Sequence, residues 1–148
     1  MLKGYLFAIA LLATTVFAGN KNQSDGSLPY YVDYSCFKLL NQADQTYVQL
    51  HFFMNRNSLT FIPKDNDSTL KAGYVVSVLF TDIKNNSNRI DRNWNTVIDD
   101  KITAQDTAKE VPLIFEYYMT LKPGNYTMQV QISDAQDTSK TGTYSDII

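Results

Sequence analysis

The amino-acid sequence predicts an all-β fold, an antiparallel sandwich of six to eight strands. Runs of alternating apolar and polar residues recur about ten residues apart, and polar turn sequences separate them. Ten tyrosines and eight phenylalanines stand against six glycines and four prolines. This balance favours strands, because aromatic side chains suit a pleated, half-buried surface. The count and spacing are typical of sandwiches of the immunoglobulin or fibronectin type III kind, with a closed barrel as the alternative.

The clearest strand follows the turn Pro123-Gly124. Proline presets φ in such a turn, and glycine allows a positive φ. From Tyr126 to Asp134 apolar and polar residues then alternate, which predicts a strand with one face in a core. A tyrosine beside a turn at this place is typical of a tyrosine corner, in which the hydroxyl bonds to nearby backbone.

The other predicted strands show the same period of two. Segment 89–102 carries Trp94 among evenly spaced isoleucines, and segment 103–110 is a polar loop with room for one helical turn. Polar turns are expected at 41–45 and 84–88, and a polar loop at 64–69. The remaining strands are expected at residues 30–39, 46–54, 59–63, 70–83, 111–121 and 143–148.

The N-terminus has the features of a secretory signal peptide. Lys3 precedes an apolar run, and the small residue Ala18 fits a cleavage site, so residues 1–18 are expected to be removed on export. The run is too short for a spanning helix of about 20 residues, so no transmembrane segment is expected in the mature chain. Residues 19–27 are polar and predict a flexible lead-in, and residues 28–148 form one sandwich domain.

Charge and cysteine content exclude several classes of function. The net charge is −2 and the basic residues are scattered, which argues against binding of nucleic acid or an anionic membrane. Cys36 is the only cysteine, so no internal disulfide forms, and its strand-like neighbours predict a buried, inert thiol. With one histidine and one cysteine, a zinc site of the usual type is excluded.

Candidate catalytic residues are few. His51 is predicted to face outward from its strand, with no nucleophile or carboxylate adjacent in the sequence, so a surface role is expected. Phosphate-binding and hydrolase motifs are absent, and no cofactor or metal is expected. The paired carboxylates lack the spacing of a calcium loop and are interpreted as turn residues. These pairs are Asp65 with Asp67, Asp99 with Asp100, and Asp134 with Asp137.

Four aromatic residues are out of phase with the predicted core positions. They should point away from a two-sheet core and, if contiguous, would form a surface for a partner or a platform for carbohydrate. These residues are Tyr31, Tyr47, Phe53 and Tyr118.

A wider pattern is carried by short motifs in a particular order. They are Tyr30-Tyr31-Val32-Asp33, Leu59-Thr60-Phe61, Trp94, Leu121-Lys122-Pro123-Gly124-Asn125-Tyr126 and Asp134. Over residues 28–148 this order resembles the N-terminal β-sandwich region of bacterial GWxTD domain-containing proteins. The Gly-Trp-x-Thr-Asp signature of that family is absent. The resemblance implies an exported protein of the periplasm or outer cell envelope of a Gram-negative bacterium, and it implies no activity.

These observations predict a non-catalytic interaction or structural module of the cell envelope, with a protein partner reached through edge strands or the outward aromatic residues. One alternative is a carbohydrate-binding module with about three coplanar exposed rings. The other is a hydrolase whose polar groups converge near His51. The chain ends at Ile148 as a strand begins, so we expect either a truncated protein or a stand-alone copy of the sandwich.

Overall fold

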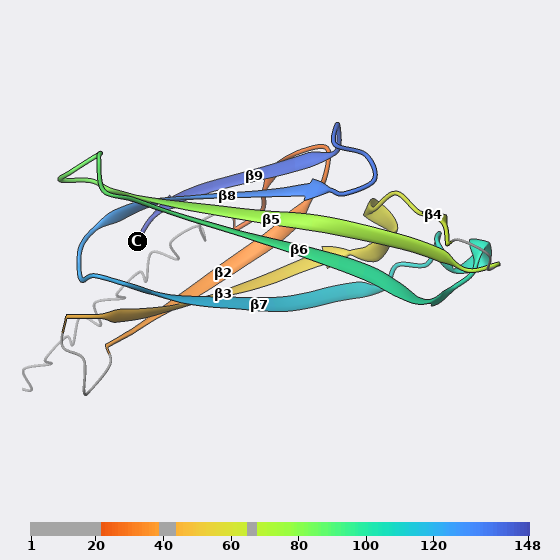
Figure 1. Cartoon of the computed structure of the whole chain (residues 1–148), viewed down its shortest axis with the longest axis horizontal. Coiled ribbons are helices and arrows are strands. Elements are labelled where there is room, and N and C mark those ends of the chain that lie inside the picture. Colours follow the sequence, from red (N-terminus) through yellow and green to blue (C-terminus); the bar gives the residue numbers. More distant parts are fainter. Residues whose placement is uncertain (1–21, 39–43, 65–67) are drawn as a thin grey trace, which may run out of the picture.

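The structure is a computed structural model that describes residues 22–38, 44–64 and 68–148. Within these ranges nine strands form two antiparallel sheets packed around one core (Figure 1). The predicted all-β sandwich is confirmed. The strand count exceeds the predicted six to eight by one, because the two-residue strand β1 lies in the segment predicted to be a lead-in. The strands are β1 (Asp25–Gly26), β2 (Tyr30–Lys38), β3 (Thr46–Asn55), β4 (Ile62–Pro63), β5 (Leu70–Asp82), β6 (Arg89–Ile102), β7 (Pro112–Leu121), β8 (Tyr126–Asp134) and β9 (Thr141–Ile147).

The two sheets divide the long strands in a pattern of the fibronectin type III kind. One sheet has the order β2-β3-β7, and the other runs β1-β9-β8-β5, with β4 and β6 also paired to β5. Among the seven long strands, the first, second and fifth thus share a sheet, and the third, fourth, sixth and seventh share the other. Two short 3-10 turns complete the described elements, η1 (Arg56–Ser58) and η2 (Ala104–Asp106). The second lies in the segment where the sequence predicts a helical turn.

The core is formed by the inward residues of both sheets, as the period of two predicts. Fully buried side chains alternate with more exposed ones along β3, β5 and β8. Two ring stacks join the sheets, Phe115 of β7 on Tyr74 of β5 at 4.7 Å and Trp94 of β6 on Tyr117 of β7 at 4.3 Å. Phe115 also stacks on Phe52 of its own sheet at 5.1 Å. A large apolar side chain that is fully buried in this core contributes about 1.5–3 kcal/mol of transfer free energy.

Within residues 22–27, where the sequence predicts a flexible lead-in, Asp25 and Gly26 form β1 and Gln23 makes an isolated bridge to Tyr31 of β2. Asp25 and Gly26 pair with Thr143 and Gly142 of β9, and Ser24 is buried. Gly26 has φ of 119°, and a Cβ there would lie 2.3 Å from the carbonyl oxygen of Thr141. The polar composition of this segment gave no indication of the pairing. The pairing provides hydrogen-bond partners for backbone N–H and C=O groups at the edge of β9. The predicted signal peptide, residues 1–18, lies outside the described residues.

The strand β8 is tied down at its first residue. Tyr126 Oη donates to the carbonyl oxygen of Lys122 at 3.0 Å, so the predicted tyrosine corner is confirmed. Gly124 does not adopt the positive φ that glycine allows, since Gly26 alone has a positive φ among the described glycines. A Cβ at Gly124 would lie 3.1 Å from the ring of Tyr126, so the small residue makes room for the corner.

Two further predictions are corrected. The strand expected at 59–63 is reduced to β4, because Leu59 is buried in the core and the N–H of Thr60 bonds to the carboxylate of Asp134. Cys36 is exposed, whereas the sequence predicts a buried thiol. Burial along β2 ends after Val32, so the last part of this strand lies outside the core. Parts of the turn predicted at 41–45 and of the loop at 64–69 lie outside the described residues.

Candidate functional site

The outer face of the three-stranded sheet carries most of the exposed apolar surface. All four aromatic residues predicted to point outward lie on it, at positions that alternate with buried core residues. Of the eight most exposed large apolar side chains in the described ranges, five belong to this face. They are Tyr31, Phe37, Phe53, Ile114 and Tyr118, with Tyr47 in ring contact with two of them. We call this surface the aromatic face.

Strand register gathers the rings into two clusters. At one end Tyr31 and Phe53 pair across β2 and β3, with ring centroids 6.0 Å apart, and Ile114 pairs with Phe53 from β7. At the other end Tyr47 contacts Phe37 at 6.4 Å and Tyr118 at 6.0 Å. Phe53 and Tyr47 are six residues apart on β3, so the two clusters lie about 20 Å apart along the sheet.

A polar belt separates the two clusters. Asp33, His51 and Glu116 stand opposite one another on β2, β3 and β7. His51 Nδ1 lies 3.2 Å from Glu116 Oε1, and Gln49 Nε2 donates to Glu116 Oε2 at 3.1 Å. The sequence shows no carboxylate near His51, because its partner is 65 residues away and only the pairing of β3 with β7 brings them together. The prediction that His51 faces outward is confirmed.

The surroundings of His51 are open and largely apolar. Its side chain is 37% exposed and that of Glu116 is 48% exposed. A hollow of about 340 Å³ beside them is lined mainly by apolar groups, including Tyr31, Phe53 and Ile114. Among the described residues, Glu116 is the hydrogen-bond partner of His51, and no hydroxyl or thiol contacts the ring. The pair can orient polar groups of a bound partner, and it lacks an activated nucleophile.

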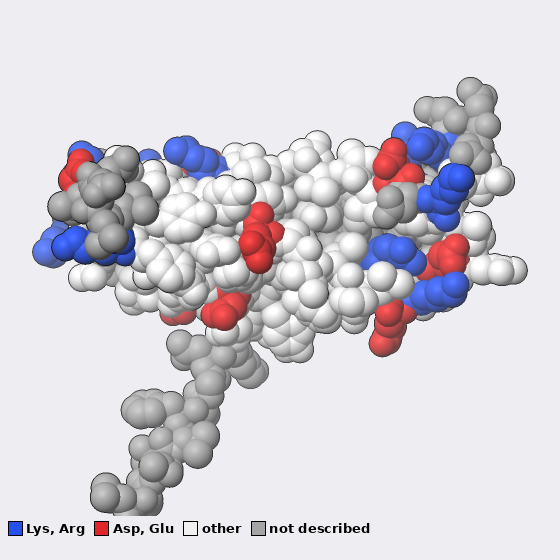
Figure 2. Space-filling view, turned by 90° about the horizontal axis from the view of Figure 1, so that it is seen from below, with Lys and Arg blue, Asp and Glu red and all other residues white. Residues whose placement is uncertain are grey.

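The aromatic face is poor in charge. Figure 2 views the molecule from the side on which β7, β3 and β2 lie in Figure 1. Its middle is mostly uncoloured, the basic and acidic side chains gather towards the two ends, and acidic groups interrupt the centre. Depletion of charge with enrichment of aromatic residues is the composition that distinguishes the centre of a protein interface from other surface.

Of the paired carboxylates, Asp134 and Asp137 serve their local turn. The carboxylates of Asp134 and Asp137 accept hydrogen bonds from backbone N–H groups of their own loop, as the interpretation as turn residues predicts. Asp99 is exposed, with Lys64 Nζ 3.3 Å away. The pair at 65 and 67 lies outside the described residues. Within the described ranges no three His, Cys, Asp or Glu side chains gather as a metal site would require.

The fold and the aromatic face together define an all-β sandwich domain with one ring-rich outer surface that is poor in charge. No model of a known protein family matches the chain, and no curated protein matches it. The part of the chain that the structure describes contains no helix long and apolar enough to cross a membrane.

Proposed function

We propose that this chain is a non-catalytic interaction module that binds a protein partner through the aromatic face. The observation that carries the proposal is the gathering of five exposed apolar side chains, with Tyr47, on one sheet face. Exposed apolar side chains scattered singly are ordinary, whereas a contiguous group marks an interaction surface. Tyrosine is also among the residues that dominate binding energy at protein interfaces.

The two clusters and the belt between them suggest how a partner is recognised. Each cluster offers a ring-lined contact, and the belt offers Glu116 and His51 as hydrogen-bonding groups at the centre. We infer that the partner carries two apolar contacts about 20 Å apart with donor groups between them. The aromatic rings bury apolar surface against the partner, and hydrogen bonds to the belt fix the orientation of the partner.

Ring orientation favours a protein partner over a carbohydrate on this face. A stacking platform needs about three coplanar rings. The interplanar angles are 27° for Tyr47 with Tyr118, 44° for Phe37 with Tyr47, and 58° for Tyr31 with Phe53. Two of the three pairs are tilted and only Tyr47 with Tyr118 is stacked, so no three rings are coplanar and the face suits an irregular protein surface better than the flat face of a sugar ring. The exposed position of His51 on an open surface likewise disfavours a hydrolase.

The proposed setting is the periplasm or outer envelope of a Gram-negative bacterium. It is supported by the apolar N-terminal segment with its small-residue cleavage site, and by the resemblance over residues 28–148 to the sandwich region of GWxTD domain-containing proteins. Cell fractionation tests the location. Reading the gene beyond the codon for Ile148 tests the relationship, because a downstream Gly-Trp-x-Thr-Asp sequence is expected if the chain derives from that family.

The partner is best sought by crosslinking in the native host. A photo-crosslinking amino acid would replace Tyr118 on the aromatic face, and in a second strain Val97, which is 64% exposed on β6 of the other sheet. We expect a discrete protein adduct from position 118 and none of that size from position 97. Adducts of identical pattern from both positions, or none from position 118, would rule out the aromatic face as the binding surface.

A further inference from the structure

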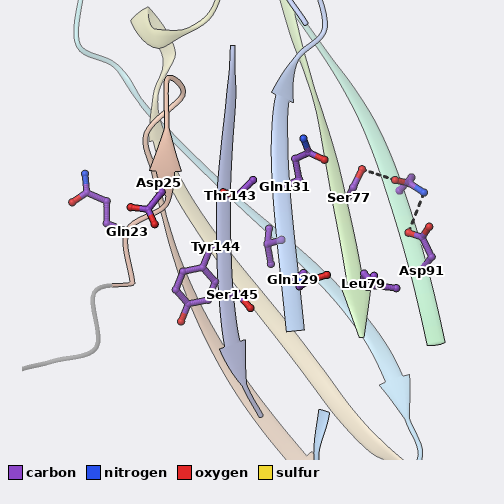
Figure 3. A pocket seen from close by; sticks show the side chains of 12 residues that line it. Gln23, Asp25, Ser77, Leu79, Asp91, Gln129, Gln131, Thr143, Tyr144 and Ser145 are labelled. Carbon is purple, nitrogen blue, oxygen red and sulfur yellow. Dashed lines mark hydrogen bonds between the residues drawn. The ribbon is translucent and has the colours of Figure 1, made fainter. Parts of the chain in front are cut away.

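A second hollow, of about 770 Å³, crosses the outer face of the six-stranded sheet (Figure 3). Strand register sets the outward side chains in two rows that run across the strands. The first row is Asn93, Ser77, Gln131, Thr143 and Asp25, and the second is Asp91, Leu79, Gln129 and Ser145. Figure 3 shows these side chains side by side, with Gln23 and Asp25 at one end of the hollow. We call it the amide groove.

The floor of the amide groove is uncharged to an unusual degree. The outward positions from 75 to 81 on β5, from 127 to 133 on β8 and from 141 to 147 on β9 contain no charged residue. Charged residues are the commonest side chains on a surface that faces only water. Their absence from three neighbouring strands is the depletion found at binding surfaces.

Many polar groups of the groove are free to bind a ligand. Ser77 Oγ donates to Asn93 Oδ1 at 2.6 Å, and Asn93 Nδ2 donates to Asp91 Oδ1 at 3.3 Å, which fixes one end. In the described part of the protein, the side chains of Gln129 and Gln131 have no hydrogen-bond partner. Each amide offers two donors and one acceptor on the exposed side of the sheet.

The lining excludes two classes of ligand. Among the described residues no lysine or arginine lines the groove, and Asp25 and Asp91 place a carboxylate near each end, so anionic ligands are disfavoured. In the two rows Leu79 is the apolar side chain that points outward from its strand, so a purely apolar ligand would leave the amides and hydroxyls of the groove without partners. A ligand rich in uncharged hydroxyl groups matches the remaining amides and hydroxyls.

We propose that the amide groove binds a neutral glycan chain that lies across β9, β8 and β5. The rows place a polar side chain about every 4.8 Å, and the first row, from β1 to β6, spans roughly 19 Å. Leu79 offers a small apolar patch for the C–H face of one sugar. A peptide is the less favoured ligand, because the groove lacks the deep apolar pocket that holds apolar peptide side chains. The proposal does not depend on the function proposed for the aromatic face.

The test is binding of the full chain to an array that carries neutral glycans, acidic glycans and polar peptides, followed by titration with the best soluble oligosaccharide. We expect binding to neutral glycans. The double variant Gln129→Ala with Gln131→Ala should weaken it about tenfold or more, through loss of several hydrogen bonds. Gln136→Ala, an exposed glutamine outside the groove, is the matched control and should leave affinity unchanged.

Several outcomes would overturn the proposal. These are binding to no glycan, preference for acidic glycans or for peptides, and equal affinity of the double variant. Tyr47→Ser with Tyr118→Ser separates the two surfaces, because it should leave glycan binding intact while reducing partner binding. Loss of glycan binding in that variant alone would place the sugar on the aromatic face. Circular dichroism and thermal unfolding confirm that each variant is folded.

Discussion

Tyr126 Oη donates a hydrogen bond to the carbonyl oxygen of Lys122, four residues earlier, at 3.0 Å. The ring is buried and packs edge-on against Phe80, so the bond closes the turn between β7 and β8 from inside. We expect Tyr126→Phe to lower the free energy of unfolding by about 1–2 kcal/mol, because the hydroxyl bond is lost and the carbonyl group loses its partner.

Urea denaturation measures this effect. Tyr118→Phe is the matched control, because Tyr118 is 62% exposed and its hydroxyl has no partner in the described part of the chain. The control should change stability by less than about 0.5 kcal/mol. Equal effects of the two substitutions would mean that the corner contributes nothing to stability.

The other end of β8 is held by Asp134, whose side chain is fully buried. Its Oδ1 accepts from the N–H of Gln136 at 2.7 Å and of Asp137 at 3.2 Å, and its Oδ2 accepts from Thr60 at 2.5 Å. Asp134→Asn turns an acceptor into a donor that faces an N–H group. We expect a loss of about 2–4 kcal/mol in thermal or urea unfolding.

A neighbouring carboxylate gives the comparison for Asp134. Asp137 Oδ1 accepts from the N–H and the hydroxyl of Ser139, at 3.1 and 2.6 Å. Asparagine retains one acceptor oxygen for these two donors, so Asp137→Asn should cost less than about 1 kcal/mol. If both substitutions cost the same, the bond from the N–H of Thr60 does not stabilise the fold.

The period of two predicted the strands and their inward and outward residues. It could not predict the contacts that depend on which distant strands pair. Alternation places Val130 inward and Gln131 outward with no knowledge of the neighbouring strand. The same pattern cannot say that Glu116 will stand beside His51, or that Thr60 will bond to Asp134, 74 residues away. The outward aromatic residues occupy strand positions that alternate with the core positions, so the sequence could predict the aromatic face. It could not predict that the face divides into two clusters.

The amide groove had no signal of its own in the sequence. Gln131 and Ser77 are ordinary outward residues of two strands, and only the register of β5 with β8 sets them side by side. The pairing of Asp25 with Thr143, which forms one end of the groove, falls in a segment whose composition predicts a linker. Sequence pattern identifies a face, and the order of strands determines which residues share it.

The raised pKa values of two tyrosines predict that the protein loses stability at high pH. Desolvation, with a hydrogen bond to Asp146, raises the pKa of Tyr34 to about 12. Burial raises the pKa of Tyr74 to about 12 as well. Both values lie above the unfolded value of about 10, so this contribution to stability is complete below pH 10 and is lost between about pH 10 and 12.

We therefore expect the free energy of unfolding, measured in urea at a series of pH values, to fall over that range. In Tyr34→Phe the fall should be shallower, because one titrating hydroxyl is gone. A variant whose stability falls as steeply as that of the native chain would contradict the assignment. Ultraviolet titration of tyrosinate checks the same pKa independently.

The exposed position of Cys36 predicts that a thiol reagent will label the folded protein. Desolvation raises the pKa of the thiol, and the thiolate is the reactive form, so the labelling rate should rise at a higher pH than for a thiol in a peptide. Mass spectrometry measures the rate under native conditions and in urea. If only the unfolded chain is labelled, Cys36 is buried in the folded protein, as the sequence predicts, and the exposed position is wrong.

Trp94 tests how firmly β6 is attached to the opposite sheet. It is the only tryptophan, and its ring stacks on Tyr117 of β7 with an interplanar angle of 14°. Because the ring is half-buried, Trp94→Ala should cost about 2–4 kcal/mol, somewhat below the loss for a fully buried tryptophan. Val97→Ala, at an exposed position of the same strand, should cost less than about 0.5 kcal/mol.

Trp94→Phe should recover part of the loss by keeping an aromatic contact with Tyr117. A negligible effect of Trp94→Ala would show that the stack does not hold the sheets together and would leave Trp94 as a surface residue available for binding.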